Sequence, residues 1–450
     1  MRENKDYLIT EKPSRALLIF SIPMIIGNLF QQAYTIVDSA IVGRYVGETA
    51  LAAVGASYAL TSIFICIAIG GGIGASVIIS HHFGAHNYGR MKTGIRTALL
   101  SFLFISLILG GIGLIFSQQI MEVLNTPADA IDIAVTYLNI YFLGLPFLFM
   151  YNILSSMFNA LGESRIPLYL LIFSSVLNIF LDLYMVAVLN LGVAGAAYAT
   201  FIAQGISAVL SLIIFVVTLQ QLQGKAEGWF SKTEFSDMSR IALPSILQQS
   251  TVSIGMMLVQ SVVNSFGTQI LAGFSAAMRI ESLCVVPMSA IGNAMSSYTA
   301  QNIGAEKEER ISQGYRAGNF MIIVIAAILC FFLEIAHKPL IALFLDNEPS
   351  AQTIVTGESY LKFIGFFFCM IGFKMAVDGI LRGAGAVRVF TIANLVNLTL
   401  RVTIAKFGAP IWGVSMVWYA VPLGWLANFL ISYGYYRTGK WKEAVSKTVD

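Results

Sequence analysis

The chain has little charge for its length. Only 11% of its 450 residues are Asp, Glu, Lys or Arg, while 57% are hydrophobic, and a soluble protein carries about 25% charged residues. Long uncharged runs, such as residues 50–80 and 166–181, accompany this composition. The sequence therefore excludes a soluble globular fold and predicts an all-α polytopic membrane protein.

Clustered cysteines, nucleotide-binding loops and a strong net charge are also missing. The four cysteines lie singly in apolar runs, whereas disulfide frameworks and zinc sites need clustered thiols. No Gly-x-x-x-x-Gly-Lys-Ser/Thr loop occurs, and the glycines within residues 70–74 stand in an apolar segment, where they permit close helix packing. The net charge is only +3. We therefore expect no cofactor, no bound metal, no nucleic-acid partner and no enzymatic activity, and we expect an ion gradient as the energy source.

Twelve apolar segments are long enough to span the membrane as helices, which takes about 20 residues each. Most Lys and Arg residues outside these segments fall in the two tails and in alternate connections. The positive-inside rule then predicts cytoplasmic termini in a multi-pass protein of the inner or plasma membrane. The expected spans are 15–43, 51–80, 93–117, 134–157, 166–189, 193–219, 237–265, 271–300, 313–336, 356–378, 387–407 and 410–436.

The two halves of the chain repeat each other. A shift of 220 residues places Arg90 on Arg310, and a shift of 223 places Tyr137 on Tyr360. Because six helices is an even number, both halves begin on the same side, related by a pseudo-two-fold axis along the membrane normal. We predict a monomer with two pseudo-symmetric six-helix bundles around a central cavity. The expected divisions are an N-terminal tail (1–14), an N-lobe (15–219), a linker (220–236), a C-lobe (237–436) and a C-terminal tail (437–450).

Charged residues inside spans are costly and are therefore candidates for function. Asp38 and Asp182 are expected about 10 Å below the outer surface, at a rise of about 1.5 Å per residue, and Thr200 reaches a similar depth. Asn178 precedes Asp182 by four residues and Tyr34 bears the same relation to Asp38, so each pair shares a helix face. If the first, fifth and sixth helices adjoin, these side chains form one polar pocket.

Two carboxylates in such a pocket repel each other, which favours a proton bound between them. The pocket therefore suits a carrier of H⁺. Sodium bound at Asp38 and Asp182 is the alternative, because carboxylate, amide and hydroxyl oxygens can also hold that ion. A purely structural role, with each acid neutral in a local hydrogen bond, is a third interpretation.

The repeat makes the first lobe distinct from the second. At a shift of 223 Asp182 falls on Ala405 and Asn178 falls on Arg401, while at 220 Asp38 falls on Leu258. Only the first lobe thus carries the two acids. This difference is expected if one lobe handles the ion.

Pro23 lies about a third of the way along the first expected span. Proline removes one backbone hydrogen bond and favours a kink, so this helix can bend between Pro23 and Asp38. A packing kink without a gating role is the alternative, because proline is common in transmembrane helices.

Glu281 is expected near the midplane, about 15 Å below the outer end of its helix. With Met278 on the same helix, and Gln248 and Gln249 on the preceding one, it can line a substrate cavity that adapts to varied cations, since methionine is flexible and polarizable. Tyr34 is a further candidate for this cavity. The alternative is an ordinary core in which a neighbouring helix satisfies Glu281.

Other charged residues also lie in or beside the spans. Lys374, Asp378 and Arg382 are spaced four residues apart, and this predicts an ion-pair ladder with a structural rather than a transport role. Arg401 lies past mid-depth, and the sequence does not identify its partner. The histidines within residues 81–86 lack metal-ligand partners and predict a solvated loop.

Taken together, these features resemble the multidrug and toxic compound extrusion (MATE) transporters over nearly the whole chain. The resemblance rests on Pro23 followed by Gln31, Gln32 and Asp38, on residues 53–57 (Ala-Val-Gly-Ala-Ser), on the Gly-Ala turns at 84–85 and 304–305, and on residues 381–385 (Leu-Arg-Gly-Ala-Gly).

The resemblance implies a secondary active exporter that moves small organic cations and other amphipathic compounds out of the cell in exchange for inward H⁺ or Na⁺. It implies ion coupling at Asp38, Asn178 and Asp182, with Thr200 as a fourth member, and bending at Pro23 on protonation. The sequence departs from the branch of the family with acids in the second lobe. A flippase for a lipid-linked precursor is the alternative, although few cations lie within the spans.

Overall fold

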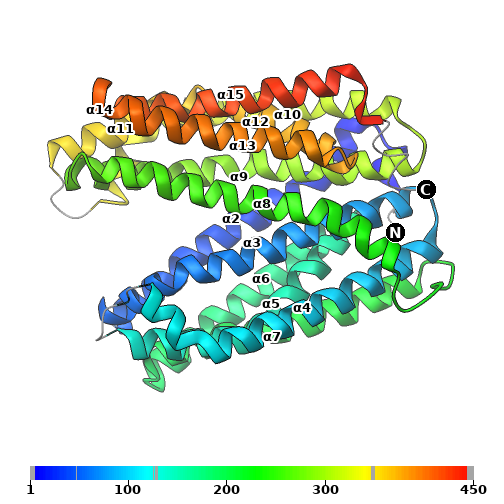
Figure 1. Cartoon of the computed structure of the whole chain (residues 1–450), viewed down its shortest axis with the longest axis horizontal. Coiled ribbons are helices and arrows are strands. Elements are labelled where there is room, and N and C mark those ends of the chain that lie inside the picture. The colour runs from blue at the N-terminus through cyan, green and yellow to red at the C-terminus, as the bar shows by residue number, and fades with distance from the viewer. Residues whose placement is uncertain (1–5, 47, 125, 127–129, 346–349, 443–450) are drawn as a thin grey trace. The chain divides into compact units, whose positions relative to one another are not determined.

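The computed structural model describes residues 6–46, 48–124, 126, 130–345 and 350–442, and in these residues the chain is helical without strands (Figure 1). The helices are α1 (Tyr7–Thr10), α2 (Pro13–Tyr45), α3 (Glu48–Gly84), α4 (Tyr88–Val123), α5 (Ile131–Ala160), α6 (Arg165–Asp182), the π-helix η1 (Leu183–Val188), α7 (Gly192–Gln220), α8 (Lys232–Asn264), α9 (Thr268–Gly304), α10 (Glu309–Ala342), α11 (Ala351–Gly365), α12 (Phe368–Gly383), α13 (Val387–Thr403), the π-helix η2 (Ile404–Gly408), α14 (Ala409–Trp412) and α15 (Ser415–Thr438).

Eleven of the described segments are long and apolar enough to cross a membrane, and α11 with α12 makes a twelfth. The twelve predicted spans are therefore present. The expectation of one continuous span over 356–378 is wrong, because α11 and α12 meet at a bend of 52°. The expected break before residue 410 is also wrong. The π-helix η2 carries the chain on into α14, and the break comes at Gly413, whose φ of +88° suits glycine.

The helices form two compact units, and neither coincides with one predicted lobe. Unit 1 contains residues 1–25 and 247–450, and unit 2 contains residues 26–246. The chain passes between the units inside α2 and inside α8. Each crossing comes two residues after a proline, Pro23 in α2 and Pro244 in α8. Both helices are continuous through their proline. The chain thus changes unit at matching positions of the two repeats.

Glycine packing explains why the start of α8 belongs to unit 2. A Cβ atom on Gly70 of α3 would lie 2.5 Å from the backbone nitrogen of Ile246, and one on Gly74 would lie 2.6 Å from the carbonyl oxygen of Met238. Real Cβ atoms do not approach backbone atoms so closely, so these positions admit only glycine without a shift of the helices. The expectation that the glycines within residues 70–74 permit close helix contact is confirmed.

The N-terminal segment packs into the core of unit 1. Leu8 of α1, and Leu17 and Phe20 of α2, are fully buried among residues of α9–α15. Asn302 donates to the carbonyl oxygen of Leu8 at 3.1 Å, and Arg310 donates to the carbonyl oxygens of residues 8 and 11. The predicted N-terminal tail thus includes a docked helix.

The start of α8 in unit 2 is held by an ionic cluster. Glu234, whose side chain is 4% exposed, lies 2.9 Å from Nε2 of His82 and 3.2 Å from Nε of Arg90. Lys92 donates to the carbonyl oxygens of Leu222 and Gly224 in the linker. The expectation of a solvated loop around the histidines is therefore wrong for His82. Its partner lies 152 residues away in the sequence and could not be read from local spacing.

Candidate functional site

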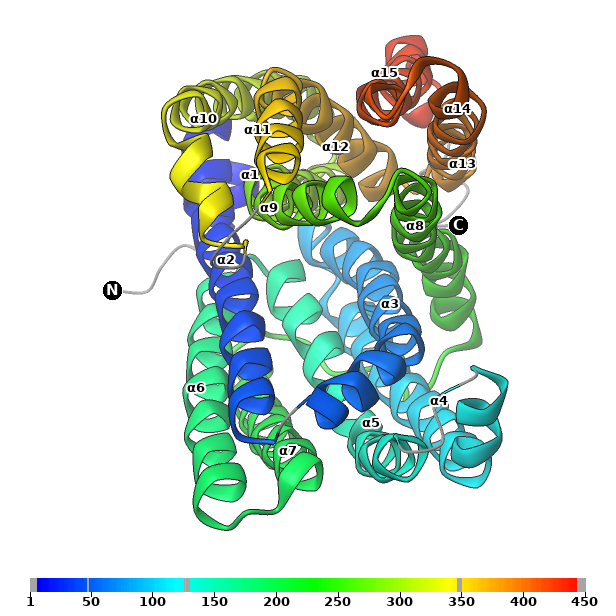
Figure 2. The ribbon, with the colours of Figure 1, turned by 90° about the vertical axis from the view of Figure 1, so that its left-hand side faces the viewer.

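The predicted polar pocket of the first half is assembled in unit 2. Tyr34 and Asp38 lie on α2, Asn178 and Asp182 on α6, and Thr200 on α7. Figure 2 shows these three helices side by side, and the contacts below join them. The four-residue spacing on α2 and α6 points each pair along one face, as expected for helices.

Asn178 links the three helices. Its side-chain amide lies 2.6 Å from the Tyr34 hydroxyl and 3.4 Å from Oγ1 of Thr200. In the amide orientation that gives both ends a partner, the Asn178 nitrogen donates to Oδ2 of Asp182 at 2.9 Å. The Asn178 oxygen then accepts from the backbone nitrogen of Thr200 at 3.0 Å. Asn178 is 2% exposed. It therefore fixes the Asp182 carboxyl in the pocket from one side.

The two carboxyl groups face each other. The carboxyl groups of Asp38 and Asp182 lie within interaction range of each other, and two carboxyl groups can form a hydrogen bond only when one of them holds a proton. Asp182 is fully buried, and one oxygen of each acid (Oδ1) is buried without a hydrogen-bond partner among the described residues. The pair is thus arranged to share a proton. Among the residues that the structure describes, no three His, Cys, Asp or Glu side chains gather where a metal ion could bind.

Tyr137 of α5 also lies beside the acidic pocket, and the site prediction missed it. It lies within electrostatic range of Asp38, Asp182 and Tyr34. A signal for it was present in the sequence, because the repeat matches Tyr137 to Tyr360. The tyrosine at the matching position of the other half also faces an acid.

In unit 1 that acid is Glu281. The Tyr360 hydroxyl donates to Oε2 of Glu281 at 2.6 Å and lies 3.7 Å from the sulfur of Met278. Glu281 is 6% exposed. Arg401 of α13 lies within electrostatic range of both Glu281 and Tyr360. The structure thus groups Met278 and Glu281, and it places Arg401, whose surroundings the sequence did not identify, within electrostatic range of that acid.

The other candidates are more scattered. Gln248 and Gln249 are half-buried on the unit 1 part of α8. Tyr34, a candidate for the substrate cavity, lies in the acidic pocket of unit 2.

The predicted ladder on α12 is only partly formed. Lys374 and Asp378 pair at 3.1 Å, with Asn394 and Ser432 as further hydrogen-bond partners. Arg382 instead donates to Ser296 and Asn293 of α9. The expectation of a three-member ladder is therefore wrong at Arg382, which bonds to another helix. All these side chains lie within unit 1.

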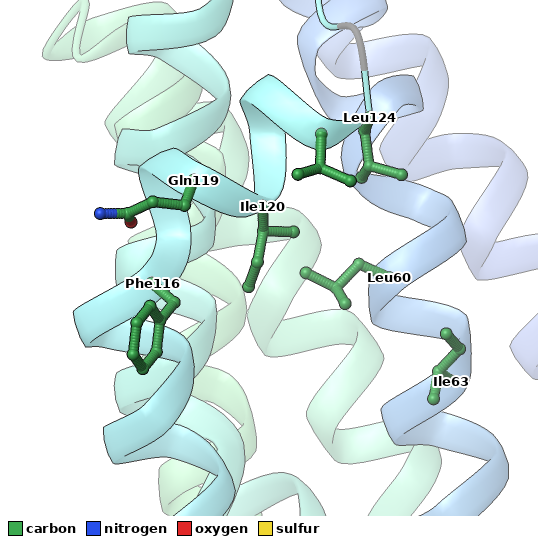
Figure 3. A pocket seen from close by; sticks show the side chains of 7 residues that line it. Leu60, Ile63, Phe116, Gln119, Ile120 and Leu124 are labelled. Carbon is green, nitrogen blue, oxygen red and sulfur yellow. The ribbon is translucent and has the colours of Figure 1, made fainter.

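A hollow of about 420 Å³ lies elsewhere in unit 2, between α3 and α4 (Figure 3). Its walls are almost wholly apolar. They come from residues 60, 63, 116, 119, 120, 123 and 124. The hollow contains none of the predicted site residues.

A polytopic helical membrane protein with a duplicated scaffold and buried carboxyl groups is a secondary transporter by class. The MatE family model matches residues 23–184 and 244–406. The probable multidrug resistance protein YpnP of Bacillus subtilis (strain 168) is 32% identical over 430 residues, covering 95% of this chain and 96% of that protein. The chain therefore belongs to the MatE family of multidrug efflux transporters.

Solved structures agree with this assignment. An outward-facing multidrug resistance MATE family transporter of the MOP superfamily matches with a TM-score of 0.88 at 25% identity, over 99% of each chain. A MOP superfamily transporter from Pyrococcus furiosus matches with a TM-score of 0.90 at 24% identity, over 98% of this chain and 99% of that one. The all-α fold with two pseudo-symmetric bundles is confirmed.

Proposed function

We propose that this protein exports cationic or amphipathic organic compounds from the cell in exchange for inward protons bound at Asp38 and Asp182. The observation that carries the proposal is the pairing of two carboxyl groups, Asp38 and Asp182, in one pocket, because two such groups can hydrogen-bond to each other only when one of them holds a proton. A buried acid pair that holds one proton can take up and release it as its surroundings change. Sodium is the alternative ion at the same carboxylates.

The other pocket residues support the pair. Asn178 donates to Asp182 and lies against Tyr34 and Thr200, so a change in the charge of the acids alters the contacts that join α2 to α6 and α7. We infer that this is the mechanical step of coupling. Protonation weakens the charge-assisted hydrogen bonds to the carboxylates, because a neutral acceptor binds a donor less strongly.

Pro23 lies close to the point at which α2 leaves unit 1 and enters unit 2. Residues 13–25 of α2 belong to unit 1 and residues 26–45 to unit 2. Proline leaves the carbonyl one turn earlier without its helical donor, so bending costs less there. We infer that α2 bends near Pro23 when the acid pair changes its protonation. Cytoplasmic termini, predicted from the basic residues, complete the proposed topology.

The test is efflux of a fluorescent organic cation from proteoliposomes, with a pH gradient and a sodium gradient imposed separately. Wild type is expected to respond to the pH gradient, and Asp38→Asn is expected to fall to the level of empty vesicles. Asp132→Asn, an exposed acid at the start of α5, is the matched control. Efflux driven only by sodium would replace the proton by sodium, and efflux that persists in Asp38→Asn would reject the site.

A further inference from the structure

The linker between α7 and α8 is bound along the start of α4. The Thr93 hydroxyl oxygen accepts from the backbone nitrogen of Glu227 at 2.9 Å, and the Thr97 hydroxyl oxygen accepts from the backbone nitrogen of Ser231 at 3.0 Å. The two hydrogen bonds are four residues apart on each segment, so the linker follows the direction of α4 for about one helical turn. This part of the linker is therefore a defined surface of unit 2.

Two aromatic side chains of this surface are exposed. Trp229 is 74% exposed and Phe230 is 50% exposed. At the shift of 221 residues that matches the two crossing prolines, they correspond to Leu8 and Ile9 of the N-terminal segment, which are 0% and 3% exposed. The segment that docks on unit 1 thus buries its apolar side chains, whereas the linker on unit 2 presents them outwards. Exposed apolar groups rimmed by polar residues mark an interaction surface.

The course of α4 shows where this surface meets the membrane. Arg96 is the last charged residue before the apolar part of the helix, because residues 97–121 contain no Asp, Glu, Lys or Arg. The central carbon of its guanidinium lies 4.6 Å from the centroid of the Trp229 ring. Leu100 and Phe104, which follow on the same helix face, are 44% and 65% exposed and are expected to face lipid. Trp229 therefore lies where the hydrocarbon region begins, the depth at which tryptophan is enriched.

Arg96 has hydrogen-bond donors available for a ligand at this boundary. Its guanidinium makes one hydrogen bond to the described residues, to the carbonyl oxygen of Gly228 at 3.4 Å. A guanidinium has five N–H donors, and their planar arrangement suits the oxygens of a phosphate group. Arg96 is only half-buried, so a ligand can reach it from the membrane side.

The balance of charge around the linker is positive. Lys225 of the linker and Lys232 at the start of α8 are exposed, and neither forms an ion pair with a described residue. Glu234 and Asp237 of α8 are already paired with basic side chains, so Glu227 is the exposed acid that remains in this segment. Surplus positive charge beside a bilayer attracts anionic lipids.

We propose that Arg96, Trp229, Phe230 and Lys232 bind an anionic phospholipid at the cytoplasmic face of the membrane. Arg96 and Lys232, which follows the linker residue bonded to Thr97, contact the headgroup phosphate, and the two aromatic rings lie beside the upper part of the acyl chains. The proposal takes the cytoplasmic face from the topology proposed above and is independent of the exported compound and of the coupling ion.

The test measures which lipid lies beside Trp229. The purified protein is placed in phosphatidylcholine vesicles that contain a minor fraction of either phosphatidylglycerol or phosphatidylcholine, brominated near the top of the acyl chains. Bromine quenches tryptophan fluorescence, and the difference between wild type and Trp229→Phe isolates the quenching of Trp229. We expect phosphatidylglycerol to be preferred at this position by about fivefold or more, because one cation near the surface attracts an anionic lipid by about that factor.

Charge variants identify the groups that hold the headgroup, each compared with the same variant that also carries Trp229→Phe. Arg96→Gln and Lys232→Gln should each lower the preference for phosphatidylglycerol about fivefold. Arg96→Lys keeps the charge without the planar donors and should retain part of the preference. Arg316→Gln is the matched control, because Arg316 is exposed and takes the position of Arg96 in unit 1 at the shift of 220. It should keep the wild-type preference.

The results that would overturn the proposal are distinct. Equal quenching by the two brominated lipids would exclude an anionic headgroup, and a preference that Arg96→Gln and Lys232→Gln leave unchanged would exclude these two ligands. Quenching of Trp229 by dissolved iodide but by neither lipid would place the surface in water. Arg96→Gln also removes the hydrogen bond to Gly228, so Lys232→Gln, which leaves the contacts between the linker and α4 in place, decides between loss of the ligand and loss of the surface. None of these outcomes depends on efflux, so they leave the export function to its own test.

Discussion

The two halves of the chain place different charges around a matching tyrosine. In unit 2 Tyr137 lies near Asp38 and Asp182, whose carboxyl groups are paired in one pocket. In unit 1 Tyr360 donates to Glu281, and Arg401 supplies the opposite charge nearby. A pair of acids changes its charge when it binds a proton, whereas a glutamate beside an arginine is already balanced. The comparison teaches that a duplicated helical scaffold can hold a proton-exchanging pocket in one half and a fixed-charge group in the other.

The largest effect is expected from removing one acid of unit 2. In Asp182→Asn the carboxyl pair is lost, so no proton can be shared, and proton-driven efflux from proteoliposomes should fall to the level of empty vesicles. The protein should still insert and unfold at nearly the wild-type temperature, because Asn keeps the size of the side chain. Efflux that stays coupled to the pH gradient would show that the comparison assigns the exchange to the wrong half.

A second large effect is expected on stability, from the Glu234 carboxylate that joins the start of α8 to α3 and α4. Glu234→Ala leaves His82 and Arg90 without their shared carboxylate, and loss of one partner of a buried ion pair costs about 3 kcal/mol or more. Thermal unfolding in detergent should therefore shift to lower temperature. The control is Glu308→Ala in unit 1, whose pair with Lys442 is exposed and contributes about 0–1 kcal/mol. Equal shifts in the two variants would contradict the burial argument.

The matching tyrosines give a direct test at a smaller scale. Tyr360→Phe removes the hydrogen bond to Glu281 and should destabilise the protein by about 1–3 kcal/mol, as for a bond to a buried charged group. Tyr137→Phe should instead change the pH dependence of efflux, since it removes the dipole of a hydroxyl group that lies within electrostatic range of the two acids. Thermal unfolding and efflux are measured on both variants. Interchanged results, with Tyr360 governing the pH dependence, would reverse the roles of the two halves.

The smallest expected effect is that of Glu281→Gln. The amide still accepts a hydrogen bond from Tyr360 but removes the negative charge, so substrate preference should change by several-fold while coupling to the pH gradient remains. A panel of cationic and zwitterionic dyes in the efflux assay measures this. An unchanged substrate profile would return Glu281 to a structural role.

Much of the fold followed from the sequence because the bilayer requires long apolar helices with internally paired backbones. The spans, the repeat and the helices that carry the acidic pocket were predictable for this reason. The bend between α11 and α12 was not, because residues 363–373, which surround it, contain no charged residue to mark a break. The π-helix η2 likewise moved the last break to Gly413 without a clear change in composition.

The site was predictable where spacing along one helix determines which side chains meet. Asp38 with Tyr34 and Asp182 with Asn178 are separated by four residues, and the structure joins the two pairs through contacts of Asn178 with Tyr34 and with Asp182. The partners of Glu281, Arg382 and Glu234 lie on helices distant in the sequence, so packing rather than spacing decides them. The repeat contained the signal for Tyr137 and Tyr360, although the repeat alone does not reveal what each tyrosine contacts.

The most direct test of the central claim is proton release on substrate binding. Purified protein in detergent with little buffer is mixed with a fluorescent organic cation, and the pH is followed as the cation binds. Release of protons by wild type, and binding without release by Asp38→Asn, is the predicted result, because the Asp38–Asp182 pair exchanges its proton for substrate. Equal proton release by wild type and Asp38→Asn, or cation binding by wild type without release, would contradict the account.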